Sequence, residues 1–183
     1  NTGERIWSWP VSQRGLNTAA LMVGPDVVIS HSEENLGTNE MGMLAAVPAG
    51  KSGTLTDKDA RWIVRGVQAG YASPVSDGQR IYVVDNGGIL FAHDAKTGAR
   101  AWEQNLGTIQ KSSPVLADGK LYVGTENGKF FIIRPLADRA EILDQDWLGS
   151  EQSPEPIIAA PAVARGRVYV ASMNAIYAIG PKM

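Results

Sequence analysis

The chain has 183 residues, a mass of 19.6 kDa and a formal net charge of only −2, which fits one globular domain. This charge provides neither the basic surface that nucleic acid requires nor a polyacidic tail. Cysteine is absent and histidine occurs twice, which excludes disulfides, thiolate nucleophiles, iron–sulfur clusters and the usual zinc-hydrolase motifs. No segment approaches the roughly 18 consecutive apolar residues of a membrane span. We therefore expect no nucleic-acid partner and no membrane span.

Short apolar runs separated by turn residues begin near the N-terminus. Residues 19–23 and 27–30 form two runs on either side of a Gly-Pro-Asp turn, and residues 44–47 form a third. A polar stretch, 31–42, separates the second run from the third, and we expect it to form a long hairpin loop. A fourth run follows and carries Trp62. This order of elements predicts a four-stranded unit.

The same order of runs returns along the rest of the chain. Tyr82 recurs as Tyr122, 40 residues later, and as Tyr169, a further 47 residues on. Each tyrosine lies in the second run of its unit, after an Asp-Gly or Arg-Gly turn, and a third apolar run follows. A fourth run carries Trp102 in one unit and Trp147 in the next. Four short strands in each period of about 40 residues predict a β-propeller.

The predicted fold is therefore all-β, a propeller segment of four four-stranded blades. The blades are expected at residues 18–64, 72–104, 112–148 and 159–179. The last of them has only three strands. Residues 2–8 resemble the start of a fourth strand, because Thr-Gly precedes Trp7 at the same interval that separates Gly98 from Trp102. We expect this N-terminal strand to complete the last blade as a closure strand, since an open sheet edge promotes aggregation.

Residues 92–102 resemble the tryptophan-docking motif of the PQQ-like (quinoprotein) β-propellers, Ala-x-Asp-x-x-x-Gly-x-x-x-Trp. The matching residues are Ala92, Asp94, Gly98 and Trp102. The resemblance covers nearly the whole chain, although the third unit lacks the Asp and the Thr-Gly of the motif. It implies that one tryptophan packs between each pair of neighbouring blades. This structural docking role would belong to Trp7, Trp62, Trp102 and Trp147.

The family contains quinone-dependent dehydrogenases and similar propellers that bind no quinone and act as scaffolds, including an assembly lipoprotein of the outer membrane. The dehydrogenases bind calcium beside the cofactor and often carry adjacent cysteines, which this chain lacks. We therefore favour a non-catalytic scaffold for binding or protein assembly, without a cofactor. PQQ and calcium belong to an alternative, a fragment of a quinone-dependent dehydrogenase. A second alternative is a sensor or interaction domain of a longer protein. The family implies an extracytoplasmic location, periplasmic or secreted.

Few residues suggest chemistry. The segment 31–40 holds an imidazole and three carboxylates, so His31, Glu33, Glu34 and Glu40 are weak candidates for a site that binds a hard cation. The segment lacks the spacing of an EF-hand, which favours a solvated acidic loop. For His93, at the end of a third strand, we expect a hydrogen-bonded structural role. No residue is assigned a catalytic role.

The blade count predicts an assembly. The resemblance to the PQQ-like propellers implies that each blade spans about one eighth of a turn, so four would span half a ring and expose two blade faces. Large exposed apolar faces drive association. We therefore expect a protein partner, favouring a second copy of the chain in a two-fold symmetric homodimer. The alternatives are a small four-bladed ring and a missing half of the same polypeptide.

Overall fold

The structure, a computed structural model, describes residues 2–181. Regular structure in this part of the chain is β-strand apart from one 3-10 turn, η1 (Asp57–Asp59). The strands are β1 (Trp7–Ser8), β2 (Leu21–Val23), β3 (Asp26–Glu34), β4 (Met41–Pro48), β5 (Gly53–Thr54), β6 (Trp62–Arg65), β7 (Val75–Ser76), β8 (Arg80–Val84), β9 (Ile89–Asp94), β10 (Arg100–Asn105), β11 (Val115–Ala117), β12 (Lys120–Gly124), β13 (Lys129–Pro135), β14 (Ala140–Trp147), β15 (Ala162–Ala164), β16 (Arg167–Ala171) and β17 (Ile176–Ile179). Among the described residues, no helix has the length and apolar character to cross a membrane.

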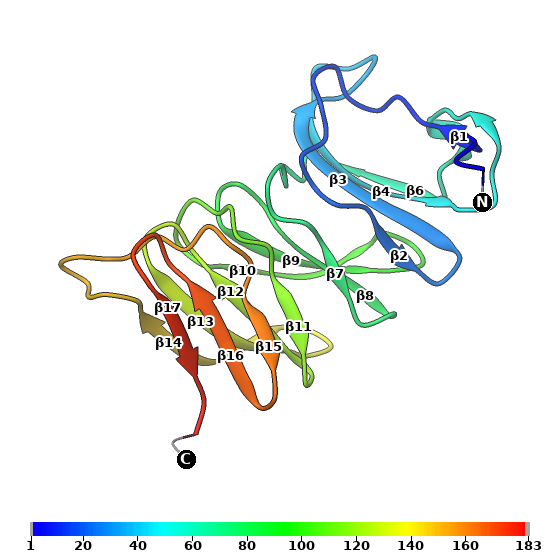
Figure 1. The fold of residues 1–183 in the computed structure, drawn as a ribbon. Helices are drawn as coiled ribbons and strands as arrows, with labels where there is room; N and C mark the ends of the chain where they lie inside the picture. Colours follow the sequence, from blue (N-terminus) through cyan, green and yellow to red (C-terminus); the bar gives the residue numbers. More distant parts are fainter. Residues whose placement is uncertain (1, 182–183) are drawn as a thin grey trace.

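Apart from β1 and β5, which pair with each other, the strands form four antiparallel meander sheets that follow one another along the chain (Figure 1). The first sheet has the order β2-β3-β4-β6, the second β7-β8-β9-β10 and the third β11-β12-β13-β14. The fourth contains β15, β16 and β17, and no further strand is paired with β17 in the described part of the chain. The predicted all-β propeller segment of four blade-like sheets is therefore confirmed.

Local sequence explains the tight hairpins that connect the first two strands of the third and fourth sheets. Asp118 and Gly119, between β11 and β12, have φ values of 49° and 66°, and Arg165 and Gly166 repeat this with 51° and 71°. Two consecutive positive φ values define a type I′ turn, whose twist matches that of the flanking strands. The Asp-Gly and Arg-Gly pairs in the sequence therefore place these turns correctly.

The core lies between successive sheets. Val28 and Leu44 of the first sheet share a buried cluster with Ile81 and Val83 of the second. The second sheet contacts the third in the same way, and the third contacts the fourth through a smaller cluster that includes Val170. The second and third sheets therefore each bury one face against the preceding sheet and the other against the following sheet, as the blades of a propeller do.

The N-terminal strand does not complete the last blade of its own chain. β1 pairs in parallel with β5, between β4 and β6, and the Ile6 carbonyl accepts a hydrogen bond from the Gly53 N–H at 3.0 Å. Figure 1 shows β1 at the opposite end of the row of sheets from β17. Within one chain, residues 2–8 therefore lie beside the first sheet and leave the last blade open, because four sheets form an arc whose ends do not meet.

The expected loop at 31–42 is also corrected. β3 continues through His31 to Glu34, with a bulge between these two residues, and β4 begins at Met41. The Asn35 side chain stabilises the short turn by donating to the carbonyls of Glu40 at 2.7 Å and Gly42 at 3.0 Å. Half of the polar stretch is thus strand, because the bulge allows polar residues to extend the hairpin.

Candidate functional site

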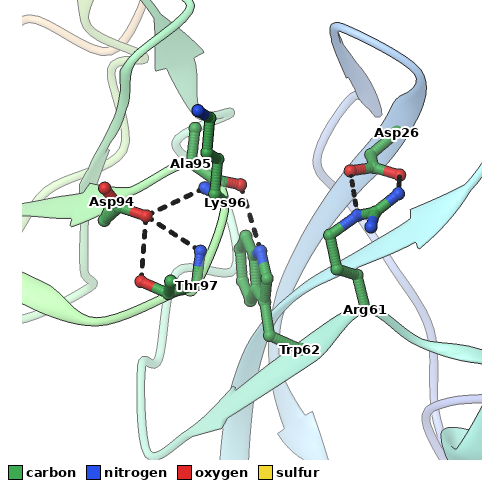
Figure 2. Close-up of polar contacts among 7 residues, drawn as sticks. All are labelled: Asp26, Arg61, Trp62, Asp94, Ala95, Lys96 and Thr97. Carbon is green, nitrogen blue, oxygen red and sulfur yellow. Dashed lines mark hydrogen bonds and ion pairs between the residues drawn. The ribbon is translucent and has the colours of Figure 1, made fainter.

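The junction between the first and second sheets is built around Trp62 (Figure 2). Trp62 lies at the start of β6, is 8% exposed, and belongs to the core cluster that both sheets share. Its indole N–H donates to the Ala95 carbonyl, in the turn after β9, at 3.1 Å. Gly98 of the same turn has φ of 74°, and a Cβ there would lie 2.7 Å from the ring carbons Cδ2 and Cε3 of Trp62. The indole therefore requires a glycine at this position.

Asp94 shapes the turn that receives the indole. One oxygen of its carboxylate, Oδ1, accepts hydrogen bonds from the backbone N–H groups of Lys96 at 3.0 Å and Thr97 at 2.9 Å, and from the Thr97 hydroxyl at 2.9 Å (Figure 2). The hydrogen bonds from Thr97 are the main reason that the pKa of Asp94 is lowered. The turn thus directs the Ala95 carbonyl toward Trp62. The motif residues Asp94 and Gly98 of the second sheet receive the tryptophan of the first.

His93 contacts the same turn through a hydrogen bond. Its side chain is 1% exposed, and Nδ1 lies 2.8 Å from the Gly98 carbonyl. Because that carbonyl can only accept, the hydrogen is on Nδ1. Burial lowers the pKa of His93. The expected hydrogen-bonded position of this histidine is observed.

Two further tryptophans make the same contact. The Trp102 indole, 6% exposed and in register with Ala92, donates to the Leu136 carbonyl of the third sheet at 3.0 Å. The indole of Trp7 donates to the Ala49 carbonyl, in the turn after β4, at 3.1 Å. Each acceptor lies in the turn that follows the third strand of the next sheet.

Trp147 differs from the expectation. It is opposite Lys129 at the far end of β14, and the Lys129 ammonium lies 5.0 Å from the centre of its ring. Asp144 is the residue that occupies the register position of Trp102, opposite Ile132. The turn before β14 lacks the Asp and Thr-Gly of the motif, so β14 is shifted relative to the pattern. Trp147 therefore lies three residues beyond the position of the other tryptophans.

An ion pair that the sequence did not indicate lies beside Trp62. The Arg61 guanidinium donates to both carboxylate oxygens of Asp26, from Nε at 2.5 Å and Nη2 at 2.9 Å (Figure 2). Asp26 is 6% exposed and begins β3. A cavity of about 400 Å³ opens next to the pair and reaches Lys96 of the second sheet. No sequence signal links Arg61 to Asp26, because 35 residues separate them and β4 lies between their strands.

The candidate cation ligands do not converge. His31 is 1% exposed inside the first sheet, and neither ring nitrogen has a hydrogen-bond partner among the described residues. Glu33 and Glu34 are half-buried, whereas Glu40 is exposed and lies 3.9 Å from Arg65. In the part of the chain that the structure describes, no group of three His, Asp or Glu side chains is placed to hold a metal ion.

One face of the sheet row, which we call the linker face, carries exposed apolar side chains. The linkers between sheets and the turns between second and third strands meet on this face, because neighbouring strands are antiparallel. Hydrogen bonds join them: the Asn86 N–H donates to the Gln68 carbonyl at 2.9 Å, and the Ile157 N–H donates to the Thr125 carbonyl at 3.0 Å. The exposed apolar residues of the linker face are Leu16, Leu36, Tyr71, Ile109, Ile158 and Met173.

Two successive linkers of the linker face each carry one large exposed apolar side chain. Tyr71, in the linker before β7, is 51% exposed, and Ile109, in the linker before β11, is 58% exposed. The Lys111 ammonium lies 5.9 Å from the centre of the Tyr71 ring and 2.7 Å from a carboxylate oxygen of Glu126. An aromatic ring, an aliphatic side chain and a charged pair thus lie on one surface, and of these the tyrosine is a residue type enriched at protein–protein interfaces.

Comparison with known proteins identifies the family. Residues 1–181 match the family model described as outer membrane protein assembly factor BamB. The chain belongs to this BamB family. BamB from Alkalilimnicola ehrlichii is 31% identical over 158 residues, which represent 84% of the chain and 38% of that protein. The chain thus spans less than half the length of this relative.

Solved structures share the fold. The crystal structure of BamB from Moraxella catarrhalis matches 96% of the chain and 45% of its own, with a TM-score of 0.65 and 17% identity. Quinohemoprotein alcohol dehydrogenase ADHIIG from Pseudomonas putida HK5 matches 91% of the chain and 30% of its own, with a TM-score of 0.68 and 15% identity. At these identities the likeness establishes the fold alone, which is built from PQQ-like repeats.

Proposed function

We propose that the protein is a non-catalytic scaffold in outer membrane protein assembly and that it binds a protein partner through the linker face. The family supports this role, because the relative from Alkalilimnicola ehrlichii is an outer membrane protein assembly factor. We propose that the protein acts outside the cytoplasm, in the periplasm. Binding requires only a shaped surface, whereas the dehydrogenase alternative requires a cofactor site and catalytic groups.

The single observation that carries the proposal is the row of exposed apolar side chains on the linker face. Half of the large apolar side chains that are exposed in the described residues lie there, although linkers and turns are usually polar. Exposed apolar side chains that gather on one face of a protein favour a role in binding. Tyr71 supplies a large and rigid contact of the kind enriched at binding hot spots. Both imidazoles of the chain are buried, so neither is placed to act on a substrate.

The tryptophans have a supporting role in this proposal. We assign Trp7, Trp62 and Trp102 as docking residues that hold each sheet to the next, because each indole N–H reaches a carbonyl of the following sheet at about 3 Å. The spacing of the linkers, and hence the shape of the linker face, depends on these contacts. A second copy of the chain completes the ring in a homodimer.

Titration calorimetry with purified soluble domains of an outer membrane protein assembly machinery tests the scaffold role. The wild-type chain is expected to bind, and the double variant Tyr71→Ala/Ile109→Ala to bind at least about tenfold more weakly. Ile142→Ala/Leu143→Ala is the matched control, since it removes two exposed apolar side chains from β14, away from the linker face. Equal affinity for all three proteins, or no binding by the wild-type chain, would contradict the proposal.

A further inference from the structure

Asp26 of the first sheet and Arg80 of the second occupy equivalent positions. Each is the first residue of the second strand of its sheet, β3 or β8. Each also lies opposite a residue that is two places beyond the alanine facing the docking tryptophan. The first sheet therefore has an acidic side chain where the second has a basic one, and the two sheets form different junctions with their successors.

The basic side chain of the second sheet crosses to the third. The Arg80 guanidinium donates from Nη2 to the Ala137 carbonyl at 3.1 Å. Ala137 directly follows Leu136, whose carbonyl accepts the hydrogen bond from the Trp102 indole. The junction between the second and third sheets is therefore bridged twice, by an indole and by a guanidinium, and both donors bind backbone carbonyls of the same turn.

The junction between the first and second sheets lacks the second of these bridges. Lys96 has the place of Ala137, because it directly follows Ala95, whose carbonyl accepts the hydrogen bond from the docking indole. A carboxylate cannot donate to a carbonyl, and Asp26 instead accepts from Arg61 of its own sheet (Figure 2). Among the described residues the Lys96 ammonium forms no ion pair. A cation of the second sheet thus lacks a partner beside this junction.

The cavity of about 400 Å³ at this junction has an excess of positive charge. Arg61, Lys96 and Asp26 are its charged lining residues, so two cations face one carboxylate. Asp26 accepts from Nε and Nη2 of Arg61, and Nη1 has no hydrogen-bond partner in the part of the chain that the structure describes. The Arg61 side chain is 42% exposed. Because the guanidinium is planar, the pair with Asp26 fixes the direction of its free N–H groups.

The rest of the cavity lining is small and uncharged. It consists of Val23, Gly24, Pro25, Gly78 and Ala95. Sites for small ligands commonly have volumes of about 300–1,000 Å³ and combine an apolar lining with a few placed polar groups. The ligand that fits this cavity therefore has an anionic group for the two cations and an apolar body of modest size.

We propose that this cavity binds a carboxylate that carries a small apolar body, with the carboxylate held between Arg61 and Lys96. A guanidinium matches the planar carboxylate, and the ammonium adds a second charge from the neighbouring sheet. The carboxylate belongs either to a free acid or to an acidic residue beside an apolar one in an extended polypeptide, and both present the same chemistry. The bound anion joins the first two sheets where Arg80 joins the second and third.

Titration calorimetry on the full chain tests the ligand class. The free acid is 3-phenylpropionate, and its uncharged match is 3-phenylpropanamide. The polypeptide form is acetyl-Ala-Val-Glu-amide, matched by the same peptide with Gln in place of Glu. At least one acid is expected to bind about tenfold or more tightly than its uncharged match, because hydrogen bonds to charged groups contribute about 1.5–3 kcal/mol. The tighter of the two acids identifies the source of the carboxylate. No binding by either acid, or equal binding by acid and match, would overturn the proposal.

Charge-removing variants test the two cations. Lys96→Gln changes an exposed side chain and is expected to weaken binding of the acid about fivefold. The double variant Arg61→Gln/Asp26→Asn removes both charges of the ion pair, so no buried carboxylate is left unpaired, and is expected to weaken binding at least about tenfold. Lys58→Gln is the matched control, because Lys58 is an exposed lysine of η1 that does not line the cavity.

The melting temperature without ligand, measured for each variant, shows that the fold is kept. Unchanged binding in Lys96→Gln, or an equal loss in Lys58→Gln, would contradict the assignment. The cavity shares no residue with the exposed apolar set of the linker face. Binding of a protein partner through Tyr71 and Ile109 is measured separately, so the carboxylate site and the scaffold role can fail independently.

Discussion

Replacing Trp62 with alanine tests the contact that joins the first two sheets. The side chain is 8% exposed and packs against Gly98, so its removal leaves a cavity between the sheets. Loss of a buried large aromatic costs about 3–5 kcal/mol. Part of this cost comes from the Ala95 carbonyl, since an acceptor left unpaired costs about 1–3 kcal/mol. We therefore expect Trp62→Ala to lower the free energy of unfolding by about 3–5 kcal/mol and Trp62→Phe by about 1–3 kcal/mol.

Urea unfolding followed by circular dichroism measures both variants without depending on tryptophan fluorescence, with the free energy taken by linear extrapolation. The chain concentration is held constant, because association contributes to apparent stability. Trp147→Ala is the control: this tryptophan is half-buried beside Lys129, and we expect a loss below about 1 kcal/mol. A loss below about 1 kcal/mol for Trp62→Ala, or equal losses for Trp62 and Trp147, would refute the docking role.

Three further predictions concern the Gly98 turn, the two buried histidines and the segment 31–40. Gly98→Ala, at φ of 74° and against the Trp62 ring, should lower the urea midpoint strongly, and an unchanged midpoint would contradict the packing. Burial lowers the pKa of both His31 and His93 from 6.5, so the unfolded chain binds more protons below that pH. Stability should be constant above about pH 7 and fall below pH 6.5 by at most about 1.4 kcal/mol per pH unit per histidine, and the fall should be smaller in His93→Asn. Millimolar calcium should leave the melting temperature unchanged, because the side chains of 31–40 do not converge, and a clear rise would reinstate the cation site.

Local sequence determined the strands and most of the turns. The recurrence of Tyr82 as Tyr122 and Tyr169 places three second strands, because short apolar runs that follow Asp-Gly or Arg-Gly turns are typical of hairpin strands. The docking motif likewise identified Gly98 as a special position. These features could be predicted because they depend on φ preferences and side-chain alternation over a few residues.

Tertiary structure decided which elements meet. Only the observed pairing of β13 with β14 shows that Asp144, and not Trp147, lies opposite Ile132 at the outer position, and only the extension of β3 buries His31. The pairing of β1 with β5 likewise depends on the arc of sheets, whose ends lie apart. A repeat in the sequence determines which strands and turns each sheet contains, because φ preferences and side-chain alternation depend on only a few neighbouring residues. Register, bulges and contacts between sheets depend on packing over long separations, and a one-residue shift changes them without altering the repeat.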